Sequence, residues 1–234
     1  MEALLRWQHP DLGIVAPMQF IPVAEETGLI VPIGKWVLKT ACLQNVAWQR
    51  QGLPNMSMAV NLTARQFSDE SLLLDIAATL RETGMQPHLL ELEITESLLI
   101  HDVEKTLRIM TGLKAMGIKI TVDDFGTCYS SLSTLRQFPL DTIKIDRSFV
   151  RDVTVDAAGE LHPEKQNLAD AIIAMGRSLS LTVVAQGVET REQADYLREH
   201  ACDEVQGFYF NKPLPTEQAT QLLLNQLGSH PAEA

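Results

Sequence analysis

Short apolar segments alternate with longer amphipathic segments along almost the whole chain, and this alternation constrains the fold more than any other feature. The strand-like segments are mostly apolar or β-branched and are bounded by Gly, Pro or polar turns. They are 56–62, 89–95, 118–124, 141–146, 181–186 and 204–210. The helix-like segments are 33–51, 69–83, 102–116, 129–137, 164–179, 191–200 and 216–227. Strands that alternate with helices in this way predict parallel pairing with right-handed crossovers.

Nearly every expected strand carries, at or near its end, a side chain that can bind a metal ion or move a proton. These side chains are Asn61, Glu93, Asp123, Asp124, Lys144, Gln186 and Gln206. In a (β/α)8 barrel the C-terminal ends of all strands converge on one mouth. An open doubly wound sheet would gather only the groups beside its switch point. The barrel accounts for the whole set, so we expect an α/β fold of the TIM-like (β/α)8 class.

The composition is that of an ordinary globular domain, with 45% hydrophobic and 21% charged residues. No linker divides it, so we expect one domain over 1–227 and a disordered tail over 228–234. The net charge of −11 argues against binding DNA or RNA through a general basic surface. Three scattered cysteines predict a reducing, cytoplasmic setting without a disulfide framework. No apolar run has membrane length, so we expect no membrane contact by this domain.

Asp123 and Asp124 stand side by side at the end of an expected strand, just before a glycine turn. Together with Glu93 and Asn61 they form an oxygen donor set suited to Mg²⁺ or Mn²⁺. Neighbouring side chains on a strand point to opposite sides, so Asp123 would bridge two ions while Asp124 leans toward the second. Two metal ions about 4 Å apart clamp the attacking and leaving oxygens of a phosphodiester displacement. An isolated Asp-Asp pair more often caps a turn. Here a metal site is favoured because Asn61, Glu93 and Lys144 are expected at an equivalent depth in their own strands.

The longer motifs resemble those of the EAL domain family, the bacterial cyclic-di-GMP phosphodiesterases. The tripeptide of the family name is Glu2-Ala3-Leu4. It is followed, in family order and spacing, by NLTARQF, LELEITES, TVDDFGTCYSSL, TIKIDRSFV, AQGVET and DEVQGFYFNKPLP. The resemblance runs from Glu2 to about Pro215, and this succession of long motifs makes it specific.

The resemblance implies a role for particular residues. The metal ligands would be Glu2, Asn61, Glu93, Asp123 and Asp124, with Asp123 shared between two ions. The side chains near the phosphate or the metal–water centre would be Arg6, Lys144 and Gln206. The acids that hold the loop 125–131, which the family links to dimerisation, would be Glu96 and Glu189. The implied reaction is Mg²⁺- or Mn²⁺-dependent hydrolysis of cyclic-di-GMP to linear pGpG by a homodimer, with Ca²⁺ as an inhibitor.

Gln186 departs from the family pattern at a position implied to be catalytic. Where the family has Glu-Gly-Val-Glu, this chain has Gln-Gly-Val-Glu, ending at Glu189. The matching glutamate is a metal-site and general-base residue in the family, and an amide cannot accept the proton of a water. Since a general base supplies about 10²–10⁴ in rate, we expect slow turnover with the ligand retained. The sequence does not separate a natural glutamine from an introduced one.

Two further departures concern the loop and the start of the chain. Cys128 replaces the glycine usual in the family loop, and a side chain there disfavours a positive φ. Only Met1 precedes Glu2, where the family has a further strand, so we count seven strands, Ala3–Trp7 included. Either the chain is truncated before Glu2, or the barrel has an open seam beside its first metal ligand.

Two functions of different classes are compatible with the sequence. The first is a cyclic-di-GMP phosphodiesterase impaired by Gln186, and the retained metal ligands favour it. The second is a non-catalytic cyclic-di-GMP receptor that passes a signal to a partner, and Gln186 and Cys128 favour it.

Overall fold

The computed structural model describes residues 1–100, 102–128, 132–151, 153 and 163–228. Its contacts divide the chain into two compact units. Unit 1 comprises Met1–Leu92, Met116–Ile118 and Pro213–Ala234, and unit 2 comprises Glu93–Ala115 and Lys119–Lys212. The predicted tail falls almost wholly on residues 229–234, which lie outside the described residues.

Unit 1 holds the first strands of the main sheet, most of the N-terminal helices and the last helix. Its elements in chain order are β1 (Glu2–Ala3), β2 (Trp7–His9), β3 (Gly13–Val15), α1 (Pro17–Thr27), α2 (Ile30–Arg50), β4 (Met58–Asn61), α3 (Ala64–Phe67), α4 (Leu72–Thr83), the 3₁₀ helix η1 (Pro87–Leu89) and α10 (Thr216–Gly228). Strand β1 pairs in parallel with β4, with Glu2 opposite Ala59. Helix α10 is bound to α2 through the Trp48 indole, which donates to Thr220 Oγ1 at 2.8 Å.

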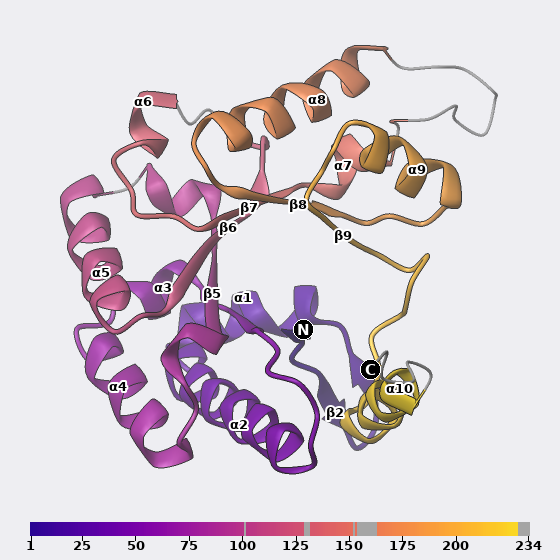
Figure 1. The fold of residues 1–234 in the computed structure, drawn as a ribbon. Helices are drawn as coiled ribbons and strands as arrows, with labels where there is room; N and C mark the ends of the chain where they lie inside the picture. The colour runs from indigo at the N-terminus through magenta and orange to yellow at the C-terminus, as the bar shows by residue number, and fades with distance from the viewer. Residues whose placement is uncertain (101, 129–131, 152, 154–162, 229–234) are drawn as a thin grey trace. The chain divides into compact units, whose positions relative to one another are not determined.

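The boundary between the units falls inside β5 (Leu90–Thr95), after Leu92. Unit 2 continues with the 3₁₀ helix η2 (Glu96–Leu99), α5 (Val103–Ala115), β6 (Lys119–Phe125), α6 (Leu132–Leu135), β7 (Thr142–Ile145), α7 (Arg147–Val150), α8 (Pro163–Ser178), β8 (Thr182–Gln186), α9 (Arg191–Glu199) and β9 (Glu204–Gln206). Strands β6, β7, β8 and β9 pair in parallel, each with the next, and α8 packs on β7 and β8 (Figure 1).

The main sheet has seven strands in the order β1-β4-β5-β6-β7-β8-β9, so each strand follows its predecessor in the chain. The strand pairs β1–β4, β6–β7, β7–β8 and β8–β9 are parallel. Strand interiors are apolar on both faces, with Leu92, Ile120, Val122, Ile143 and Ile145 fully buried. Such continuous apolar runs are typical of parallel sheets covered by helices. Within the described residues, the helices lack the combination of length and hydropathy that a membrane span requires.

The N-terminal region differs from the sequence prediction. Ala3–Trp7 is not one strand, because β1 ends at Ala3 and Trp7 begins an antiparallel hairpin of β2 with β3. The hairpin turn is held by His9 Nδ1, which accepts the amides of Asp11 and Leu12, and it uses Gly13 at φ +68°. The indole of Trp7 packs edge-on against Phe20 of α1, at 5.8 Å between ring centroids.

The last strand is also shorter than predicted, since β9 ends at Gln206 rather than at residue 210. A Cβ added to Gly207 would lie 2.0 Å from Val188 O, and the Tyr209 amide donates to that same oxygen. The chain therefore turns onto the segment after β8 instead of extending the strand.

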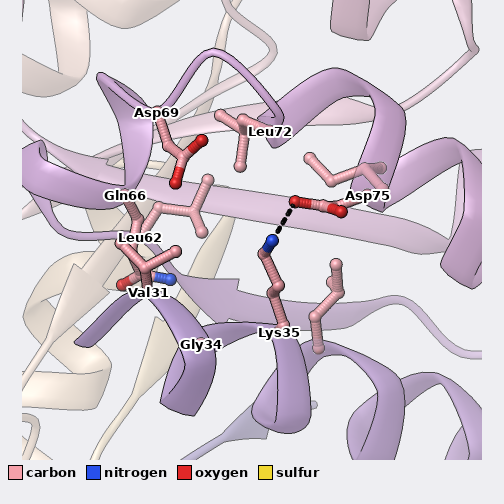
Figure 2. A pocket seen from close by; sticks show the side chains of 10 residues that line it. Val31, Gly34, Lys35, Leu62, Gln66, Asp69, Leu72 and Asp75 are labelled. Carbon is pink, nitrogen blue, oxygen red and sulfur yellow. Dashed lines mark ion pairs between the residues drawn. The ribbon is translucent and has the colours of Figure 1, made fainter. Parts of the chain in front are cut away.

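A small crevice between α2, α3 and α4 is a product of helix packing in unit 1 (Figure 2). Lys35 Nζ reaches Asp75 Oδ2 across it at 2.7 Å. Gly34 of α2 allows close approach of the Gln66 amide, because a Cβ there would lie 1.8 Å from Gln66 Nε2. Gln66 also completes the capping box of α3 with Thr63. None of the predicted site residues lines this crevice.

Candidate functional site

A buried ion pair joins two strands of unit 2. Lys144 Nζ of β7 pairs with Glu93 Oε1 of β5, and their side chains are 5% and 0% exposed. The flanking residues Ile94 and Ile143 are fully apolar and buried. Removing two charges from water costs several kcal/mol per ion, so a buried pair contributes little to net stability. Its presence in an otherwise apolar strand layer points to function.

The two adjacent aspartates form a β-bulge. Register pairs Val122 with Ile143 and Phe125 with Ile145, so Asp123 and Asp124 together lie opposite Lys144 alone. Asp124 has a left-handed backbone, with φ +53°. Bulges of this kind often occur beside active sites, where they redirect a side chain. The strict alternation of facing that the sequence predicted for this pair therefore does not hold across the bulge.

The surroundings of the Asp124 carboxyl disfavour its charged form. Desolvation raises its pKa to about 6, and the negative charges of Asp123 and Asp146 and a hydrogen bond with Asp146 add to the rise. The nearby Arg147 guanidinium opposes it. The residue is exposed overall, but its carboxyl stands among like charges and loses hydration. A divalent cation would relieve this repulsion.

Glu96 holds the loop that follows the bulge. Its buried carboxylate accepts the Gly126 amide at 2.9 Å and the Cys128 amide at 3.1 Å through Oε2. Cys128 does not adopt a positive φ, so its side chain fits this loop conformation. Glu189 is exposed, and its backbone amide donates to Gln193 Oε1. The predicted loop residues 129–131 lie outside the described residues.

Gln186 and Gln206 end neighbouring strands. They are register partners in the β8–β9 pair, and the Val188 amide donates to Gln206 O at 3.0 Å. Gln186 is half-buried and Gln206 is exposed. The structure thus places two amides side by side at the C-terminal end of this part of the sheet.

In unit 1, Glu2 and Asn61 come together at the paired strands β1 and β4. Asn61 Nδ2 donates to Glu2 Oε1 at 2.9 Å. The exposed guanidinium of Arg6 donates to the adjacent Leu5 O at 2.8 Å. The predicted site residues therefore form a Glu2–Asn61 pair in one unit and a Glu93–Lys144–Asp123–Asp124 group in the other.

The donor chemistry fits a hard divalent cation, because carboxylate and amide oxygens are the ligands that Mg²⁺ and Mn²⁺ prefer. Among the residues that the structure describes, however, no group of three or more His, Cys, Asp or Glu is already placed to hold a metal ion. The fit rests on the donor set and on the like-charge repulsion at Asp124, which a cation would offset.

Sequence reasoning missed two residues beside this group. Asp146 caps α7, with Oδ1 accepting the Ser148 amide at 2.8 Å, and it interacts with Asp124. Arg147 lies next to Gly187, where a Cβ would come within 2.6 Å of Arg147 Cβ. The one available signal was an acidic residue directly after an apolar strand, followed by a basic one.

Comparison with known proteins identifies one family. The family model of the EAL domain matches residues 1–213. Signaling protein YkoW of Bacillus subtilis (strain 168) is 44% identical over 225 residues, which are 96% of this chain and 27% of that protein. The bifunctional diguanylate cyclase/cyclic di-GMP phosphodiesterase MucR of Pseudomonas aeruginosa is 43% identical over 218 residues, which are 93% of this chain and 31% of that protein. The chain thus spans about a quarter to a third of the length of these relatives.

A solved structure of the PaMucR phosphodiesterase in complex with c-di-GMP matches with a TM-score of 0.88 at 43% sequence identity. The match covers 93% of this chain and 86% of that chain. Together with the parallel strands in sequential order, it confirms the predicted TIM-like (β/α)8 class, here with seven main-sheet strands among the described residues.

Proposed function

Because this chain belongs to the EAL domain family, we propose that it hydrolyses one phosphodiester bond of cyclic-di-GMP to give linear pGpG, using Mg²⁺ or Mn²⁺. The observation that supports this most is the grouping of Glu93, Lys144 and the Asp123–Asp124 bulge on three successive strands. A relative named as a cyclic di-GMP phosphodiesterase and a related structure with bound c-di-GMP support the choice of substrate.

The residues that would hold the metal ions are Glu2, Asn61, Glu93, Asp123 and Asp124. When bound, the two ions would polarise the phosphodiester and lower the pKa of an attacking water. Lys144 supplies a buried cation directly opposite the bulge, suited to a phosphate oxygen or the catalytic water. Arg6 and Gln206, which would contact the ligand, are both exposed. Glu96 fixes the loop after Asp124 through two backbone amides, which limits movement of the bulge.

Gln186 makes binding without efficient turnover the second candidate function. Its amide oxygen is a poor proton acceptor, so it orients a water but cannot deprotonate it. Removing a negative charge at the end of β8 also reduces repulsion of an anionic dinucleotide. A cyclic-di-GMP receptor would show binding with no pGpG. We favour the enzyme because the proposed metal ligands are all retained in the sequence.

The proposal includes an assembly and a setting. We expect a homodimer, because the loop after Asp124 resembles the family segment linked to dimerisation. We expect this part of the protein to act in the cytoplasm, with Ca²⁺ inhibiting by replacing the smaller ion. Size-exclusion chromatography with light scattering tests the first expectation, and adding Ca²⁺ to a Mn²⁺-dependent assay tests the last.

The decisive experiment is incubation of the chain with cyclic-di-GMP and Mn²⁺, followed by chromatographic separation of substrate from pGpG. We expect slow, metal-dependent product formation that a chelator abolishes. Asp123→Asn is the matched loss-of-function variant, since it keeps the shape and removes the charge. Binding measured by calorimetry without any product would favour the receptor. Absence of both binding and product would overturn the two candidates together.

A further inference from the structure

Helix α7 is a single turn, Arg147–Val150, between the two segments that carry the candidate catalytic residues of β6 and β8. It begins directly after β7, and its cap is tied to the end of β6 because the Asp146 amide donates to Phe125 O at 3.3 Å. Its other end is tied to α9, since Gln193 Nε2 donates to Arg151 O at 3.0 Å. The helix is therefore fixed at both ends.

The β6 side of α7 packs on the turn after the bulge. Gly126 follows Asp124 by two residues and has φ +99°. A Cβ on Gly126 would lie 2.7 Å from Phe149 Cε2 and 3.2 Å from Ile172 Cδ1 of α8. The Phe149 ring thus covers the Gly126 backbone with no room for a methyl group. The amide of the same glycine donates to Glu96.

The β8 side of α7 packs on the turn after Gln186. Gly187 has φ +76°, and a Cβ there would lie 2.6 Å from Arg147 Cβ and 3.4 Å from Arg147 Cα. Two glycines with positive φ, one beside each candidate catalytic segment, therefore contact the first and third residues of the same short helix. Only glycine satisfies both the backbone angle and the close approach at these points.

We propose that α7 is a spacer that sets the position of the Asp123–Asp124 bulge, and that Phe149 is the positioning residue through which it acts. Glu96 holds the turn at Gly126 by two hydrogen bonds to backbone amides. Phe149 and Ile172 pack against the same turn and limit how far Gly126 can move. A bulge disrupts the ladder of the sheet locally, so we expect the position of this one, with its left-handed Asp124, to depend on these neighbours. This inference rests on the proposed function only where it concerns metal binding.

The test compares Phe149→Ala, Phe149→Leu and Phe138→Ala in the full chain. Phe138 is buried in the same unit and precedes the N-terminal end of β7, opposite in the strand direction to Asp146. It therefore reports loss of a buried phenylalanine without loss of the spacer contact. Hydrogen exchange is measured at the Gly126 and Cys128 amides, and Mn²⁺ affinity is measured by the shift in thermal unfolding.

In Phe149→Ala we expect exchange at these two amides to rise by about tenfold or more, because the turn gains freedom to open. We expect the Mn²⁺ concentration for half-maximal stabilisation to rise about tenfold, the lower end of what loss of a ligand-orienting contact costs. Phe149→Leu should recover most of both effects. Phe138→Ala should lower the melting temperature while leaving the two amides and the Mn²⁺ midpoint unchanged.

Unchanged exchange in Phe149→Ala would overturn the spacer role, whether or not the chain hydrolyses cyclic-di-GMP. Faster exchange with an unaltered Mn²⁺ midpoint would also overturn it, since the turn would then move without affecting the site. Faster exchange in a chain that binds no Mn²⁺ at all would overturn the proposed metal-dependent function and the metal part of this inference, while supporting the spacer contact itself.

Discussion

The Glu93–Lys144 pair offers the sharpest test of how the site is built. Lys144→Met keeps a similar length and removes the charge, which leaves Glu93 buried without this cation. The two side chains are 0% and 5% exposed, so solvent screening gives little relief. Breaking a buried pair by removing one partner costs about 3–5 kcal/mol. We therefore expect the free energy of unfolding to fall by about 3–5 kcal/mol, measured by urea denaturation with a chelator present.

The double variant Glu93→Leu with Lys144→Met is the matched control. Apolar residues of similar volume often replace a buried ion pair without loss, so we expect it to unfold within about 1.5 kcal/mol of the parent chain. The cost in the single variant then belongs to the Glu93 carboxylate that has lost Lys144 and not to lost packing. Adding Mn²⁺ should stabilise Lys144→Met more than the parent, because Glu93 regains a positive partner. A single variant within about 0.5 kcal/mol of the parent would refute the reasoning, as would a double variant less stable than the single one.

Two further predictions concern the carboxylates. Gln186→Glu should raise pGpG production tenfold or more, since a general base contributes about 10²–10⁴ in rate. The same change at its register partner, Gln206→Glu, should not raise pGpG production. Equal rates for Gln186→Glu and the parent chain would contradict the assignment of residue 186 as the position of the general base. Asp124 has a pKa of about 6 in the folded chain against 3.8 for the ordinary group, so the folded state binds more protons between these values. In chelator, the stability of the parent chain relative to Asp124→Asn should therefore increase as the pH falls from 7 to 4. Denaturation curves at several pH values check this, and a difference that stays flat or changes in the other direction would contradict it.

The fold was largely predictable because apolar runs in parallel strands are long and regular. The expected segment 89–95 differs from β5 (Leu90–Thr95) by one residue, and 181–186 differs from β8 (Thr182–Gln186) by one. The hairpin of β2 and β3 was missed because its two strands have only three residues each and show no clear alternation. Helix α1 was missed because Pro22 interrupts its pattern, although the structure keeps the helix continuous.

The site was predictable as a set of residue types but not as a geometry. A parallel sheet allowed Glu93 and Lys144 to be assigned to the same end of the strands, but their ion pair from β5 to β7, with β6 between the two strands, was not predicted. The bulge at Asp123 and Asp124 depends on the positive φ of Asp124, and this backbone angle cannot be inferred from two adjacent aspartates in the sequence. The support from α7 depends on contacts between residues far apart along the chain, such as Phe149 with Gly126, and no periodicity encodes such contacts.

The charge balance suggests why metal binding and substrate binding would be coupled. The chain carries a net charge of −11, and unit 2 places Asp123, Asp124 and Asp146 within mutual influence. An anionic dinucleotide would be repelled there unless positive charge is added. Lys144 is already committed to Glu93, so it is not a free cation for a phosphate. Glu93 can release Lys144 only by finding another positive partner, and a ligand role toward a divalent ion provides one. The same exchange of partners would then complete the metal centre and free Lys144 for the phosphate, so that each ligand raises the affinity for the other.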